Sequence, residues 1–150
     1  MPARTKTTAS AKGKKSDFAA AFEGLRKVLR PYDKKLQVIK DDRLGYMSMS
    51  KSLRYLGKPV MFASITSKSY VSFDFFPVYM FPEMLKPISP ELRKRMQGKT
   101  CWNFKKFEGP LFAELGGLIG EGFRRFAALG ERDLTREDAL AFWGAANKKR

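Results

Sequence analysis

Apolar residues near the start of the chain recur at intervals of three or four, the spacing of one face of a helix. This stripe consists of Phe18, Phe22, Leu25 and Leu29. Because Pro31 follows and proline interrupts helical hydrogen bonding, we expect a helix over residues 17–30. A longer stripe predicts a helix over residues 110–129. Thr135 is suited to cap a last helix, whose apolar side holds Leu140, Phe142 and Trp143.

Between these helices, apolar and β-branched residues gather in short segments, some with the alternation of period two that is typical of β-strands. We expect strands over residues 36–40, 45–50, 59–66, 70–78 and 100–105. Turn residues separate the first four, Asp41-Asp42 among them, so the sheet should be mostly antiparallel. Strands in one block with helices at both ends predict an α+β fold. In this fold a five-stranded sheet carries the N- and C-terminal helices on one face.

The composition makes this a basic protein. The 150 residues carry a formal charge of +15 and are 43% hydrophobic, which suits one domain with its own core. Residues 1–15 contain five cations, no acid and no apolar run, so we expect a disordered basic arm before a single domain over residues 16–150. The arm does not resemble a secretory signal, and no segment reaches about 18 consecutive apolar residues. We therefore expect a cytoplasmic protein.

The chain has no histidine and one cysteine. These counts exclude a Ser-His-Asp triad, an imidazole metal ligand, a thiolate cage and an intrachain disulfide. Acid–base catalysis would then fall to carboxylates or lysines, and no pair of them is spaced for it. We expect no enzyme, no cofactor and no metal site.

Cations are concentrated between Lys86 and Lys106, where seven of them face one acid, Glu91. Ser89-Pro90 predicts a short helix that Gly98 ends. In the strand that follows, odd positions share one face and even positions the core face. The candidate anion-binding residues are Arg93, Lys94, Arg95, Lys99, Asn103, Lys105 and Lys106. Two interpretations remain open: a site for phosphate groups, or a solvated face of a basic protein.

Two further features allow a chemical and a structural interpretation. Cys101 would share a strand face with Lys99 and Lys105, whose charges would favour a reactive thiolate; the alternative is a small buried side chain. Four glycines between Gly116 and Gly122 lack the spacing of a phosphate-binding loop and lie within a helical pattern. Close packing of that helix explains them better.

Several segments resemble a known family. They read Lys-Pro-Val-Met-Phe-Ala from Lys58, Tyr-Val-Ser-Phe from Tyr70, Pro-Val-Tyr-Met from Pro77 and Ile-Ser-Pro-Glu-Leu-Arg-Lys-Arg-Met-Gln-Gly-Lys-Thr-Cys-Trp-Asn-Phe-Lys from Ile88. They resemble the YdhG-like domain of uncharacterised bacterial proteins, most of all over Arg95–Phe104. The resemblance implies a frataxin-like layout, with helices on one face of an antiparallel sheet.

Some YdhG-like proteins are labelled iron chaperones, and the YjbR-like proteins, which share the layout, are proposed to bind DNA. Frataxin-type iron binding uses an acidic ridge on the first helix and first strand. Here the first helix carries Arg26, Lys27 and Arg30, which oppose a hard cation. We therefore expect a non-enzymatic binding module for nucleic acid or another polyanion. The alternative is a frataxin-like metal-handling or protein-interaction domain.

Overall fold

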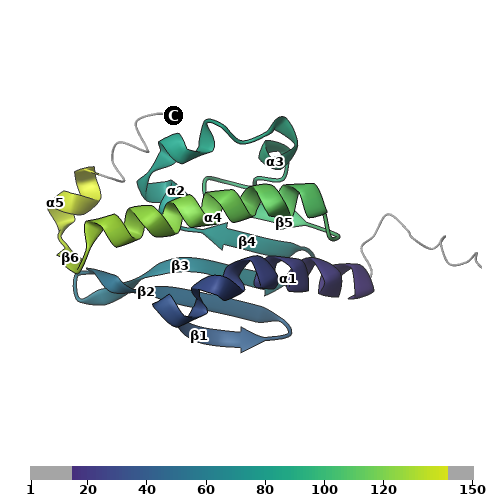
Figure 1. Ribbon diagram of the computed structural model, residues 1–150, viewed down its shortest axis with the longest axis horizontal. Coiled ribbons are helices and arrows are strands. Elements are labelled where there is room, and N and C mark those ends of the chain that lie inside the picture. Colours follow the sequence, from purple (N-terminus) through teal and green to yellow (C-terminus); the bar gives the residue numbers. More distant parts are fainter. Residues whose placement is uncertain (1–14, 142–150) are drawn as a thin grey trace, which may run out of the picture.

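The computed structural model describes residues 15–141. Nearly all of the expected basic arm, and Phe142 and Trp143 of the expected last helix, lie outside this range. Within it, an antiparallel sheet carries two long helices on one face (Figure 1). The predicted α+β class is therefore confirmed.

The two long helices follow the predicted apolar stripes. Helix α1 spans Lys15–Leu29 and helix α4 spans Gly109–Leu129, and they lie beside each other over the sheet (Figure 1). Helix α1 ends at Leu29, next to the expected residue 30, and Pro31 lies in the first turn of a 3-10 helix, η2, over Arg30–Lys35. Proline is tolerated there since a first-turn N–H has no partner within the helix.

The sheet follows the chain in order, β1-β2-β3-β4-β5, and each neighbouring pair is antiparallel. Its strands are β1 (Leu36–Asp42), β2 (Gly45–Tyr55), β3 (Lys58–Ser67), β4 (Val71–Phe75) and β5 (Cys101–Phe104). A short strand that the sequence did not reveal, β6 (Arg132–Leu134), pairs with β2 in parallel. Three residues are too few to show a period of two.

The expected fourth strand was too long at its end. Pro77–Met80 forms a short helix, α2, and Pro82–Leu85 forms a 3-10 helix, η3. Proline has no N–H for a sheet ladder, so Pro77 begins a helix although aromatic and β-branched residues surround it. Helix α3 covers Pro90–Lys94, with the Ser89 hydroxyl accepting from the Leu92 N–H, as the capping pattern predicted. Its C-cap is Arg95, so the helix ends before Gly98, the residue expected to end it.

The last helix, α5, spans Arg136–Ala139, begins at the cap expected at Thr135 and carries a capping box there. Leu140, expected on its apolar side, follows the helix and is 72% exposed. The hydroxyl of Thr135 accepts from the Asp138 N–H, and the Asp138 carboxylate accepts from the Thr135 N–H. Among residues 15–141, no helix is long and apolar enough to cross a bilayer.

Aromatic side chains fill the layer between sheet and helices. Phe73, Phe75, Trp102 and Phe104 all point into it and are buried, as strand alternation predicted. Gly122 of α4 lets the helix approach the sheet closely, because a Cβ atom there would lie 2.5 Å from Cζ of Phe75. This contact confirms at Gly122 the close packing expected of the four glycines, whereas at Gly117 no atom lies within 4 Å of the Cβ position and packing does not explain the glycine.

Candidate functional site

The basic block between Lys86 and Lys106 does not form one surface. Strand β5 covers only Cys101–Phe104, so Lys99 precedes it and Lys105 follows it. A short segment after α3 pairs with the edge of β5: the Asn103 N–H donates to the Arg95 carbonyl at 2.8 Å. The strand is thus shorter than the expected residues 100–105, and Lys99 and Lys105 lie outside it.

Several candidate residues are engaged within the protein. Arg95 binds Glu108 through two hydrogen bonds, Nε–Oε2 at 2.9 Å and Nη2–Oε1 at 2.7 Å, and these raise the pKa of the guanidinium. Arg93 donates to the carbonyl of Leu85 at 2.8 Å. The Asn103 carbonyl oxygen accepts from Ser72 Oγ at 2.8 Å. Arg95 and Asn103 thus have structural partners, whereas Lys94 on α3 is exposed.

Cys101 does not have the surroundings of an activated thiol. Its side chain is half-buried on β5, opposite Asp74 of β4. Burial raises the pKa of the thiol, and the Asp74 carboxylate raises it further. The two lysines expected beside it lie beyond the strand. A raised pKa is the opposite of what a reactive thiolate needs.

Lys105 and Lys106 instead lie at one end of the sheet, where three loops meet. Strand register places the β1–β2 turn beside the end of β3, and the start of β4 beside the end of β5. Backbone bonds join the turns: Ser67 N–H donates to the Leu44 carbonyl at 3.0 Å. We call this region the loop-end surface and define it by Arg43, Leu44, Lys68, Tyr70, Lys105, Lys106 and Phe107. In Figure 1 it is the right-hand end of the sheet, where α1 and α4 begin.

The loop-end surface combines exposed cations with exposed apolar side chains. Arg43, Lys68, Lys105 and Lys106 are all exposed. Among the described residues, six large hydrophobic side chains are exposed, and three of them lie here: Leu44 (62%), Tyr70 (42%) and Phe107 (52%). The Lys105 ammonium lies 5.5 Å from the centroid of the Tyr70 ring. Single exposed apolar side chains are ordinary on a protein surface, so the feature that distinguishes this one is that three of them lie together among four cations.

The two carboxylates in these loops are engaged with other groups. Asp42 accepts from the backbone N–H groups of Leu44 and Gly45 at 2.9 and 3.0 Å, which together with Lys40 lowers its pKa. Glu108 is bound by Arg95. The four cations of the loop-end surface therefore dominate its charge.

A hollow of about 450 Å³ opens between α1 and the first two turns of the loop-end surface. Phe18, Ala19 and Phe22 of α1 line one side. Leu44 and Ser67 line the other, and charged groups complete the lining with Glu23, Arg43 and Lys68. The hollow is thus apolar inside, and two cations and one carboxylate contribute to it. No pattern in the sequence predicts this hollow, because its walls come from three separate segments.

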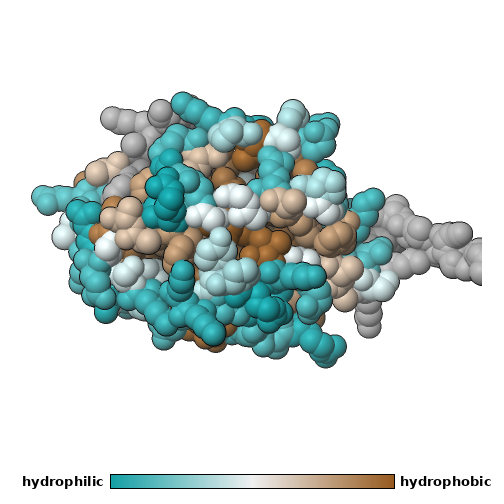
Figure 2. All heavy atoms as spheres, viewed as in Figure 1, coloured by the Kyte–Doolittle hydropathy of each residue, from teal (hydrophilic) through white to brown (hydrophobic). Residues whose placement is uncertain are grey.

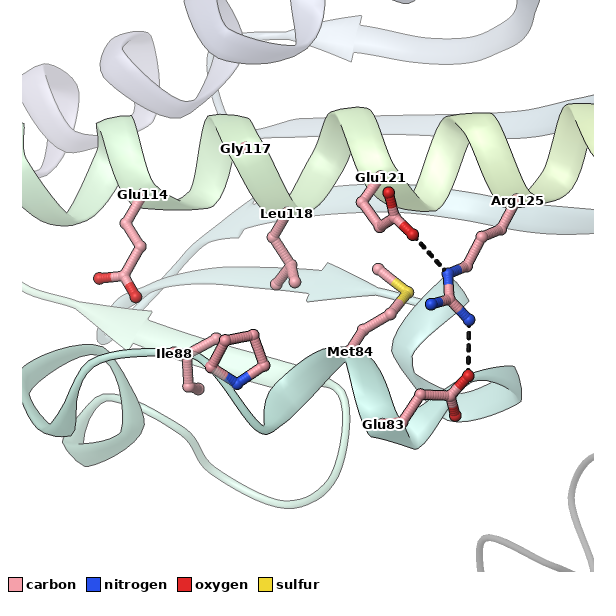
Figure 3. A pocket seen from close by; sticks show the side chains of 9 residues that line it. Glu83, Met84, Ile88, Glu114, Gly117, Leu118, Glu121 and Arg125 are labelled. Atoms are coloured by element: carbon pink, nitrogen blue, oxygen red, sulfur yellow. Dashed lines mark hydrogen bonds and ion pairs between the residues drawn. The ribbon is translucent and has the colours of Figure 1, made fainter.

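A second groove, of about 330 Å³, lies between α4 and the segment from η3 to α3 (Figure 3). Met84, Ile88 and Leu118 are its apolar lining, and its three carboxylates have partners within the protein. Arg125 binds Glu83 and Glu121 at 2.6 and 2.7 Å. Glu114 accepts from the N–H and hydroxyl of Ser89, so it supports the start of α3. These contacts give the groove's polar groups a structural role.

Hydrophobic side chains are also visible away from the loops. Figure 2 shows them in the middle of the helix-covered face, with hydrophilic residues around its edge.

The structure offers no candidate metal site among residues 15–141. Within that range, no three or more Cys, Asp or Glu side chains come together as ligands.

One ion-pair cluster was not anticipated from the sequence. Arg26, one of the cations expected near the end of the first helix, has only 2% of its surface exposed and binds Asp33 and Asp41. Asp41, expected in a turn, is the second-last residue of β1 and faces α1. No single-sequence signal joins these residues, since they come from three elements.

No family model, curated protein or solved structure matched this chain, so the YdhG-like resemblance stays a prediction.

Proposed function

We propose that this protein is a non-enzymatic binding module that engages nucleic acid through the loop-end surface. The observation that carries the proposal is the placement of Lys105 against Tyr70, with three further exposed cations and two further exposed apolar side chains around them. Lysine and arginine bind backbone phosphates, and exposed aromatic rings stack on bases. One surface therefore offers groups for both parts of a nucleotide.

The segment before α1 supports the same proposal by its composition and its point of attachment. It carries Arg4, Lys6, Lys12 and Lys14 and no acid. It joins the folded chain at Lys15, where α1 begins beside the loop-end surface. Basic arms add electrostatic affinity that does not depend on sequence. We propose further that the chain belongs to the YdhG-like family. We also propose a cytoplasmic location, because a chain with one cysteine forms no intrachain disulfide and suits a reducing compartment.

The test is binding to duplex DNA, single-stranded DNA and RNA over a range of salt concentrations, for the full chain and for a chain that begins at Ser16. If about five phosphates are neutralised, the logarithm of the binding constant should fall with the logarithm of salt with a slope near −4. The K105A/K106A variant should weaken binding and reduce that slope by about 1 to 2.

The matched control is K58A/K86A, which removes two exposed lysines away from the loop-end surface and so changes the net charge equally. Equal losses in the two double variants would contradict a local site. Binding by the full chain alone would assign the affinity to residues 1–15. No binding by either chain, with saturable binding of ferrous or ferric iron at physiological salt, would favour the metal-handling alternative.

A further inference from the structure

The hollow beside the loop-end surface has the size and lining of a pocket for one nucleobase. Its volume is about 450 Å³, and Phe18, Phe22 and Leu44 give it apolar walls. Flat aromatic bases leave water readily for such surroundings, and stacking on aromatic side chains depends little on base identity. A base in a duplex is stacked and paired, so it cannot enter a hollow without leaving the helix.

The cations at the hollow are placed for the backbone of the same strand. Arg43 and Lys68 belong to its lining. Tyr70 follows Lys68 by two residues, and Lys105 lies against the Tyr70 ring. A strand that inserts one base in the hollow therefore meets cations on the adjoining turns. The Tyr70 ring, 42% exposed, offers a second stacking surface. This alternation of rings and cations is typical of single-strand binding.

We propose that the hollow accepts one unstacked base, and that the nucleic acid bound by this protein is single-stranded. The inference rests on the proposed function and sharpens it by naming the class of nucleic acid. Glu23 is the one carboxylate in the lining. A carboxylate accepts hydrogen bonds from amino groups on base edges. Bases that carry an amino group should therefore bind better than uracil or thymine.

Two exposed alanines on the long helices provide a matched test. Ala19 of α1 lines the hollow, whereas Ala128 lies in the last turn of α4, away from the loop-end surface. The A19F variant should fill the hollow without changing charge, while A128F adds the same ring at the other end of the helical layer. Removal of one stacked base should weaken single-strand binding about 5-fold to 100-fold in A19F. Duplex binding should stay within about twofold, and A128F should match the unchanged protein in both assays.

The probes are short oligo(dA), oligo(dC) and oligo(dT) strands and a duplex of the same length. A fluorescent adenine analogue in the oligo(dA) strand reports whether a base unstacks on binding. The L44S variant, which alters an exposed residue at the hollow, is a second variant in case A19F unfolds. The E23Q variant should reduce the preference for oligo(dC) over oligo(dT).

The outcomes separate this inference from the proposed function. Duplex binding as tight as single-strand binding, or undiminished single-strand affinity in folded A19F and L44S, would overturn the base pocket. Sensitivity to K105A/K106A would still support the loop-end surface in that case. Loss of all binding by the unchanged protein would overturn both.

Discussion

Arg26 of α1 donates two hydrogen bonds to Asp41 of β1, Nε–Oδ1 at 3.0 Å and Nη2–Oδ2 at 2.9 Å. Its remaining guanidinium contacts are a pair of bonds to Asp33 of η2 and the face of the Tyr46 ring, 4.2 Å away. The Asp41 hydrogen bond is the main cause of the raised pKa of Arg26, and Arg26 lowers the pKa of Asp41 in turn. A single side chain thus links a helix, a 3-10 helix and two strands.

This arrangement predicts which member of the cluster is most sensitive to mutation. The double variant D33N/D41N would leave a buried guanidinium without a counter-charge, and we expect it to lower the free energy of unfolding by about 1 to 3 kcal/mol. The R26M variant removes the charge and keeps an apolar side chain against Tyr46, so its loss should be smaller. Urea unfolding of the three proteins checks this. A larger loss in R26M would show that the ion pairs stabilise the fold by more than the desolvation of Arg26 costs.

Stability should depend on pH through Glu121. Hydrogen bonds from Arg124 and Arg125 lower the pKa of this carboxyl from 4.5 to about 2. A pKa that is depressed in the folded state stabilises the fold above the unfolded value, and the contribution is lost as pH falls from about 4.5 to about 2. The E121Q variant should therefore lose less stability over that range. Because the group is exposed, added salt should reduce the difference between the two proteins.

Two glycines of α4 should respond oppositely to alanine. A Cβ atom at Gly122 would lie within 3 Å of the Phe75 ring and of Pro77, so G122A should lower the unfolding free energy by about 1 to 3 kcal/mol. At Gly117 no atom lies within 4 Å of that position, so G117A should raise it by up to about 1 kcal/mol through helix propensity alone. Thermal unfolding measures both. Destabilisation by G117A would mean that the helix needs glycine there for another reason.

Arg95 should matter more for stability than for binding. It holds Glu108, directly before α4, through a two-point ion pair with both partners partly shielded from water. The R95A variant should cost about 1 kcal/mol of stability. Its effect on nucleic-acid affinity should be smaller than that of K105A, in the binding assay described above. If R95A weakens binding as much as K105A does, then Arg95 leaves Glu108 when the ligand binds.

Cys101 should react slowly with alkylating reagents near neutral pH. Burial and the Asp74 carboxylate raise the pKa of its thiol, so the thiolate population is small. The D74N variant removes one of these causes and should increase the alkylation rate at a given pH. The rate as a function of pH, followed by mass spectrometry, gives the pKa in both proteins. A pKa in the unchanged protein below that of an ordinary thiol would contradict this environment.

Much of the fold could be predicted because its helices and strands depend on local sequence patterns. The stripe from Phe18 to Leu29, the alternation around Phe73 and the capping pairs at Ser89 and Thr135 each depend on neighbours a few residues away. The predictions of secondary structure failed where two local preferences compete or where an element is very short. Pro77 turned a strand-like aromatic segment into a helix, and β6 was too short to leave a pattern.

The candidate site was less predictable from the sequence, since closeness along the chain did not indicate which residues lie together on the surface. Lys99 and Lys105 are six positions apart, yet they lie beyond opposite ends of β5. From the sequence, Arg95 was a candidate anion-binding residue, whereas in the structure it binds Glu108. Conversely, Leu44, Tyr70 and Phe107 belong to three separate loops and gave no common signal.

The sequence by itself determined the α+β class, the core faces of the main elements and the basic character of the protein, because helical and strand periodicity and net charge are properties of composition and local order. Only the tertiary structure decided which cations remain available and which apolar groups join them. Strand register sets that choice: it brings the turns after β1, β3 and β5 to one end of the sheet, where Lys105 meets Tyr70.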